Sequence, residues 1–164
     1  MGLLRRSLAV ISPAALAALW VVTCQATSGA HRLPARIATH FDAAGRANGW
    51  GEPRMLWLLP IIAAFVFALM TLASLFPQSF HYPVPTTPAT LPRLQAISLS
   101  MVAWLRAEVT GLLLWIQCVI IRAARDGEDR LSPLSMPLVT GIIFATILVH
   151  IAAMVRAARE DARS

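Results

Sequence analysis

Four long apolar segments, separated by polar ones, dominate the pattern of this chain. They cover about residues 7–25, 55–76, 98–121 and 136–154. A helix that crosses a membrane needs about 20 predominantly apolar residues, and each segment is close to that length. The pattern therefore predicts an all-α membrane protein, in which one domain of residues 1–164 forms a bundle of four transmembrane helices.

The composition agrees with a lipid environment. The chain has 164 residues, a mean hydropathy of +0.66 and 13% charged residues, whereas soluble domains carry about a quarter. The net charge is +6, but the arginines lie at the ends of the apolar segments rather than together. Nucleic-acid binding needs basic residues gathered on one face, so we expect the bilayer, and no nucleic acid, as the main partner.

The distribution of arginine gives only a slight preference for one orientation. Both sides of the membrane receive similar numbers, but Arg5 and Arg6 precede the first span, which often decides topology. We expect a cytoplasmic N-terminus, with the loops 26–54 and 122–135 outside. The alternative is that the first span is a signal peptide cleaved near Ser28-Gly29-Ala30, although its apolar stretch is longer than a typical signal core.

The connecting segments contain residues typical of turns. Five prolines between residues 77 and 93, the last of them Pro92, predict an extended loop. In the loop 26–54, residues 37–41 are predicted to be extended, and Gly45 suits a positive φ. Asn48-Gly49 favours a type I′ turn. Asp42 is placed to close an Asx-turn on the amides of residues 43–45. This loop is predicted to be a short structured cap on the bundle.

The same loop resembles a bacterial membrane family known as domain of unknown function 1648 (DUF1648). Its members share a pattern close to L-P-x-x-I-P-x-H-[FW]-[ND]-x-x-G-x-x-[DN]-G-[WYF] before a transmembrane helix. The matching residues are Leu33, Pro34, Ile37, His40, Phe41, Asp42, Gly45, Asn48, Gly49 and Trp50. Ala38 and Pro53-Arg54 depart from it, where the family often has Pro and Lys. The resemblance implies a multi-pass protein of the bacterial cell (inner) membrane. The domain also occurs in SdpI-like immunity proteins, which protect a cell from a secreted peptide toxin and can sequester a repressor.

Two groups of residues are candidates for chemistry. His40 and Asp42, two apart in an extended piece, would point to one face, where a metal ion or a proton relay could use both, with His31 as a third ligand. We favour bonds to the loop itself for this pair, and expect no metal, no cofactor and no catalytic residues. The intramembrane polar residues Arg106, Glu108 and His150 form the second group.

An ionisable group in lipid costs at least ~2.5 kcal/mol on insertion scales, so these three residues need partners. Arg106 and Glu108 belong to two polar stripes of the third span, which predicts that this helix is central. Glu108 and His150 lie toward the same membrane face, and a proton-sensitive contact between them is geometrically possible. The alternative is that Arg106 reaches the headgroups and Glu108 pairs with an arginine such as Arg156.

These observations favour a non-enzymatic recognition, immunity or signalling component. Its partner would be another membrane protein, a peptide toxin or a second copy of the chain. A small proton-coupled transporter or channel, dependent on Glu108 and His150, is the alternative. A membrane-embedded enzyme using His40 and Asp42 ranks third, since no nucleophile stands beside them.

Overall fold

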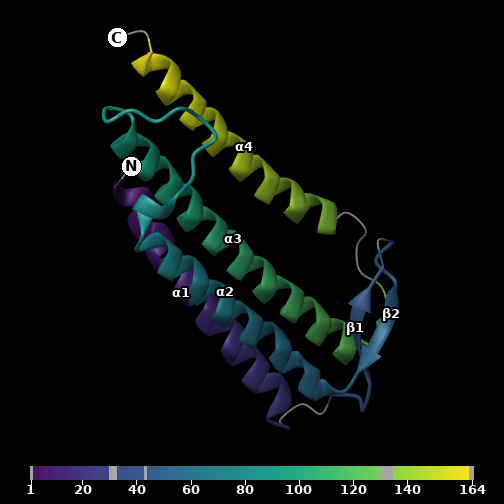
Figure 1. The fold of residues 1–164 in the computed structure, drawn as a ribbon. Coiled ribbons are helices and arrows are strands. Elements are labelled where there is room, and N and C mark those ends of the chain that lie inside the picture. The colour runs from purple at the N-terminus through teal and green to yellow at the C-terminus, as the bar shows by residue number, and fades with distance from the viewer. Residues whose placement is uncertain (1, 30–32, 43, 129, 131–134, 163–164) are drawn as a thin grey trace.

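The fold consists of four long helices and one β-hairpin (Figure 1). The structure is a computed structural model that describes residues 2–29, 33–42, 44–128, 130 and 135–162. In chain order the elements are α1 (Gly2–Thr27), β1 (Ile37–Phe41), β2 (Ala47–Gly51), the 3₁₀ turn η1 (Pro53–Trp57), α2 (Leu58–Ser74), the 3₁₀ turn η2 (Pro77–Ser79), α3 (Leu91–Asp126) and α4 (Ser135–Asp161). Each of the four predicted spans coincides with a helix that is long and apolar enough to cross a membrane.

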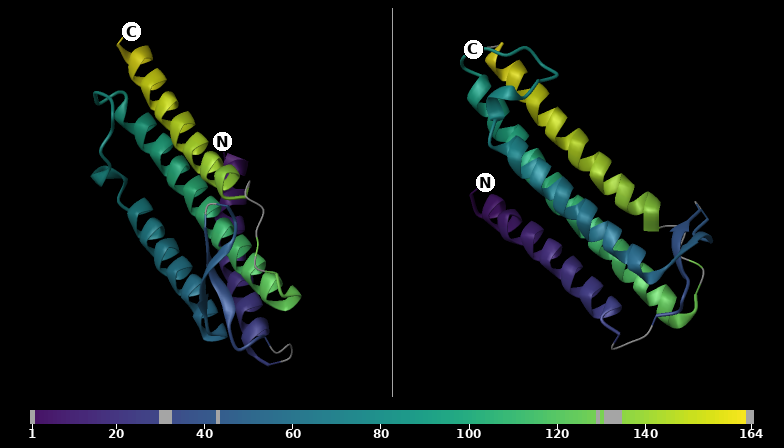
Figure 2. Two further views of the ribbon diagram at one scale, coloured as in Figure 1. Left: turned by 90° about the vertical axis from the view of Figure 1, so that its right-hand side faces the viewer. Right: turned by 60° about the horizontal axis from the view of Figure 1, so that its bottom comes forward.

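Helix α3 is the central element, as its two polar stripes predict. It packs along α1, α2 and α4, whereas α4 packs mainly on α3. Figure 1 shows α1 and α2 on the side of α3 away from α4, and the left view of Figure 2 shows α3 between α2 and α4. The bundle is therefore a unit of three helices, α1 to α3, with a fourth helix attached to α3.

Helix α3 is longer than the span predicted at 98–121. This helix has 36 residues, which is about 54 Å at 1.5 Å per residue and well beyond a hydrocarbon core of roughly 30 Å. The helix begins at Leu91, so the extended loop predicted for 77–93 ends at residue 90 rather than at residue 93. Pro92 lies in the first turn, where a helix needs no amide donor. At the other end Gly127 adopts a φ of 71° and closes the helix.

The hairpin is held against the end of the bundle by an apolar cluster. β1 and β2 are antiparallel, with irregular register around His40. Ile37 of β1 is buried against Ala26 of α1, Leu56 of η1, and Ile120 and Ile121 of α3. Beyond the hairpin turn, Arg46 forms a backbone bridge with Arg130, after the end of α3. The hairpin thus lies at the C-terminal end of α3.

A buried glutamine joins three elements above this cluster. Gln117 of α3 is fully buried, and its Nε2 donates to Thr23 Oγ1 of α1 at 2.8 Å and to the carbonyl oxygen of Leu56 at 3.0 Å. The amide that would ordinarily bond to Leu56 belongs to residue 60, which is proline and has no N–H. The side chain of Gln117 therefore donates to Leu56 in place of the amide that Pro60 lacks.

Candidate functional site

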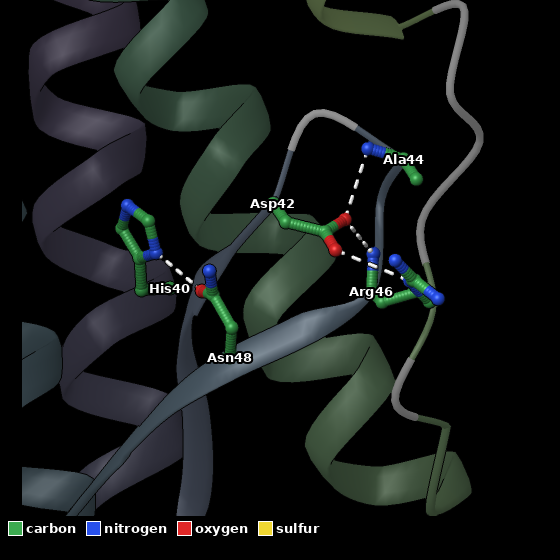
Figure 3. A network of polar contacts seen from close by, with 5 residues as sticks. All are labelled: His40, Asp42, Ala44, Arg46 and Asn48. Carbon is green, nitrogen blue, oxygen red and sulfur yellow. Dashed lines mark hydrogen bonds and ion pairs between the residues drawn. The ribbon is translucent and has the colours of Figure 1, made fainter.

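The turn of the hairpin is built around Asp42. Its Oδ1 accepts hydrogen bonds from the amides of Ala44 and Arg46, at 2.9 and 2.8 Å, and its Oδ2 accepts one from Arg46 Nε at 3.1 Å (Figure 3). Gly45 has a φ of 74°, which L side chains rarely adopt. The predicted Asx-turn and positive φ are both present. The bond from the Arg46 amide is the main reason that the pKa of Asp42 lies below its ordinary value.

The predicted type I′ turn at Asn48-Gly49 is wrong, because both residues lie inside β2. His40 Nδ1 instead donates across the hairpin to Asn48 Oδ1. A Cβ atom on Gly49 would lie 2.8 Å from the Cβ of His40, closer than two such carbons approach. Glycine at position 49 is therefore needed for the close approach of β1, and Asn48 for the bond to His40.

The hairpin separates His40 from Asp42. Figure 3 shows the imidazole and the carboxylate pointing in different directions, each toward its own partner. The register irregularities on either side of His40 break the alternation that would have placed the two side chains on one face. Within the described ranges no three His, Cys, Asp or Glu residues are grouped to hold a metal ion; His31 lies outside those ranges.

The remaining motif residues divide between anchoring and exposure. Phe41 packs against the apolar cluster, while Pro34 is exposed just before β1. Trp50, in β2, is 50% exposed. It lines a hollow at the base of the hairpin together with Arg36, Glu52, Arg54 and Met55. Trp50 is thus a large aromatic side chain that the hairpin presents outward.

The comparison with known families agrees with the segment that these residues define. Residues 14–64 match the family described as Domain of unknown function (DUF1648). The match runs from within α1 to within α2, so the hairpin lies at its centre. No curated protein and no solved structure matches the chain. Most residues of the shared pattern pack or form hydrogen bonds within the hairpin, whereas Pro34 and Trp50 are exposed. Trp50 is the large aromatic side chain of these two.

Outside the DUF1648 segment, Arg106 turns inward rather than to the headgroups. Its Nη1 donates to Thr71 Oγ1 of α2 at 3.0 Å, and its Cζ lies 5.0 Å from the centre of the Phe67 ring. The ring face attracts the cation. Arg106 Nε is buried and has no hydrogen-bond partner among the described residues. The expectation that this side chain escapes to the membrane surface is wrong, because α2 offers both a hydroxyl and an aromatic face.

Glu108 contacts neither His150 nor Arg156 by any hydrogen bond or ion pair within the described part of the chain. Thr146 of α4 donates its hydroxyl to Glu108 Oε1. His150, one turn further along α4, donates from Nδ1 to the backbone oxygen of Thr146 at 2.8 Å and approaches Ser100 Oγ with Nε2 at 3.4 Å. Glu108 and His150 are therefore neighbours that share Thr146, with no direct bond between them. Glu108 Oε2 is buried without a partner in the described structure.

Two residues that form hydrogen bonds between helices, Thr146 and Gln117, are not among the candidate residues predicted from the sequence. Thr146 lies in the apolar segment 136–154, and Gln117 lies in the apolar segment 98–121. One signal was available for both: a polar side chain inside a span requires a partner on a neighbouring span. Pro60 provides a second signal, since it leaves a carbonyl oxygen without its helical donor.

Proposed function

We propose that this protein is a non-enzymatic recognition module of a bacterial cell membrane, and that the hairpin at 37–51 is its binding surface. The observation that carries the proposal is that different residues of the hairpin have different structural roles. Ile37 and Phe41 anchor it, Asp42 and Asn48 fix its shape, and Trp50 remains exposed beside a hollow. Rigid aromatic side chains presented on a fixed frame are typical of binding surfaces.

The chemistry around Trp50 favours a peptide or a protein segment as the partner. Arg36 and Arg54 bring positive charge to the hollow, Glu52 pairs with Arg54, and Met55 adds a soft apolar wall. Such a surface suits a chain with an apolar side chain next to an acidic group. A secreted peptide toxin, another membrane protein or a second copy of this chain could each present one.

The hairpin residues support recognition better than catalysis. His40 and Asp42 are each engaged inside the hairpin, and they face different ways. General acid–base chemistry needs such groups within reach of one substrate atom. The burial of Leu19 and Thr23 of α1, together with the bond from Gln117, supports a first helix that stays in the mature protein. We retain a cytoplasmic N-terminus, which places the hairpin outside.

Site-specific photocrosslinking in the native membrane tests the proposal. A photoreactive amino acid at position 55, beside Trp50 in the same hollow, is expected to give one discrete adduct containing a peptide or protein. The matched control is Leu69 of α2, which is 54% exposed and should yield lipid adducts. Lipid adducts alone at both positions would overturn the proposal.

A growth competition tests the immunity form of the proposal. A strain lacking the gene is expected to be outgrown by its parent in shared medium. The wild-type chain and Phe65→Ala, a change at a 68% exposed position of α2, should restore survival. Trp50→Ala should not restore it, although the protein reaches the membrane. Equal growth of the strain lacking the gene would exclude immunity and leave recognition of another partner.

A proton-coupled transporter is the second candidate, favoured by the polar groups between α3 and α4. Ser100, His150, Thr146 and Glu108 follow one another along that interface. Two features weaken it. The link from His150 to Thr146 uses a backbone oxygen, which does not relay protons, and α4 packs mainly on α3, so one copy encloses no path. Proton flux into liposomes that disappears in Glu108→Gln would establish this candidate over recognition.

A further inference from the structure

A groove between α3 and α4 has the chemistry of a lipid site at one edge of the membrane. It lies at the end of the molecule opposite to the hairpin and has a volume of about 630 Å³. Arg93 and Arg156 lie at its outer part, and Ser100 and His150 in its deeper part. Between them the walls are small or aliphatic, including Ile97 and Ala153. The groove is thus charged at one end and apolar along its length.

The depth of the groove fits the boundary between headgroups and hydrocarbon. Ala9 of α1 and Ser74 of α2 line a common hollow with Val102 of α3, so the apolar parts of α1 and α2 finish near the level of Val102. Ser100 is two residues from that level. Arg156 lies six residues beyond His150, which is about 9 Å along α4. The backbone of Arg156 is therefore about 12 Å outside the level of Val102, beyond a polar headgroup layer of roughly 5–8 Å, and its long side chain, tilted toward the N-terminus of α4, reaches back to the lipid phosphates.

The charges in the groove leave an excess of one positive charge. Glu160 pairs with Arg93 through an ion pair of 2.5 Å. Arg156 is exposed, and no ion pair involves it among the described residues. An anionic phosphate is therefore the complementary group, because it would meet Arg156 directly and Arg93 beside it.

The position of α4 makes the groove reachable from the bilayer. Because α4 packs mainly on α3, the groove between them is a side of the bundle rather than its interior. The glycerol and ester oxygens of a bound lipid would lie beside Ile97 and Ala153, between the arginines and Ser100 and His150, and the acyl chains would continue past His150 toward the hydrocarbon. Small walls such as Ala153 provide the room, and basic pockets between helices commonly hold acidic headgroups.

We propose that the α3–α4 groove binds one acidic phospholipid, with its phosphate at Arg156 and Arg93 and its acyl chain along α3. This inference is independent of recognition by the hairpin. It gives the weakly packed helix α4 a second contact with the bundle through the bound lipid.

Native mass spectrometry of the purified full chain tests this site with phosphatidylglycerol and phosphatidylcholine of equal acyl length. The wild type is expected to retain one phosphatidylglycerol in preference to phosphatidylcholine. Arg156→Gln should weaken phosphatidylglycerol retention about fivefold, the effect expected of one arginine near a membrane surface. Arg125→Gln is the matched control, since Arg125 is an exposed arginine at the other end of α3, and should leave retention unchanged.

Two further measurements make the test decisive. Ala153→Phe, which fills the groove, should reduce retention of phosphatidylglycerol while the helical circular dichroism stays the same. Inorganic phosphate should not displace the lipid, because the acyl chain contributes to binding. The proposal is overturned by equal retention of the two lipids, by unchanged retention in Arg156→Gln, or by displacement with phosphate alone.

Discussion

At the scale of single residues, the hairpin depends on short polar contacts and one close approach. His40 is bonded to Asn48, Asp42 holds the turn, and Gly49 leaves space for the Cβ of His40. The sequence was sufficient to predict the Asx-turn and the conformation of Gly45, since both depend on neighbouring residues. The contact of Gly49 with His40 depends on strand register, which local sequence does not determine here.

Gly49→Ala is expected to loosen the hairpin by about 1–3 kcal/mol, the usual cost of forcing an extra carbon into a filled space. The new Cβ would press on the Cβ of His40, at 2.8 Å in the unaltered backbone. Hydrogen exchange of the amides in residues 37–51 measures the effect. Gly111→Ala is the control, because a Cβ there meets nothing within 4 Å. Equal protection in both variants would contradict the described register.

The ionisation of Asp42 makes the turn sensitive to acid. Its pKa is lowered from the ordinary 3.8, mainly by the hydrogen bond from the Arg46 amide. A lowered pKa means that the carboxylate stabilises the folded turn at pH values above 3.8, and that this contribution is lost as the pH falls through the lower, folded value. The side-chain carboxyl resonance of Asp42, followed by NMR in micelles, should therefore titrate below pH 3.8.

Two variants separate the causes of this shift. Arg46→Ala removes the guanidinium but keeps the amide, so the pKa of Asp42 should remain below 3.8, though less so. Asp42→Asn should make protection of the Ala44 and Arg46 amides insensitive to acid. A resonance that titrates at or above 3.8 in the wild type would show that the turn does not hold the carboxylate.

At the scale of elements, hydrophobic patterning predicts which segments are helices but not where they stop. The spans predicted at 98–121 and 136–154 are parts of α3 (Leu91–Asp126) and α4 (Ser135–Asp161). Charged residues such as Arg93 and Arg156 mark the membrane edge, yet a helix continues into water as long as its backbone bonds are made. The partners of buried groups, such as Thr71 for Arg106, can be identified only from the packing of the helices.

Gln117 donates to the carbonyl oxygen of Leu56 in place of the amide that Pro60 lacks, and this gives a prediction about packing. Gln117→Leu leaves the carbonyl oxygen of Leu56 without its donor and removes the bond to Thr23. Stability should fall by about 1–2 kcal/mol, the range for lost interhelical bonds and an unsatisfied buried carbonyl. Thermal unfolding in detergent, followed by circular dichroism, measures this loss.

A second substitution identifies the cause of that loss. Pro60→Ala restores an amide that can bond to Leu56 within the helix. The double variant Pro60→Ala/Gln117→Leu should therefore be more stable than the sum of the two single changes indicates. Strictly additive effects would mean that Gln117 does not replace the missing donor.

At the scale of the whole molecule, the two ends of the bundle are built differently. The hairpin and the C-terminal end of α3 lie together at one end, where Arg46 meets Arg130. The other end carries the loop 75–90 between α2 and α3, the last turns of α4 and the proposed lipid groove. The chain passes through α2 and α3 between the hairpin and the end of α3. Because each of these helices crosses the membrane once in this account, both positions face the same side.

Labelling of single cysteines in intact cells tests this arrangement most directly. In a chain lacking Cys24 and Cys118, Asn48→Cys and Arg125→Cys should react with a membrane-impermeant maleimide from outside, and His81→Cys only after permeabilisation. All three positions belong to aqueous segments in this account, and the first two share one side. Labelling of Asn48→Cys and Arg125→Cys from opposite sides, or of all three from the same side, would contradict it.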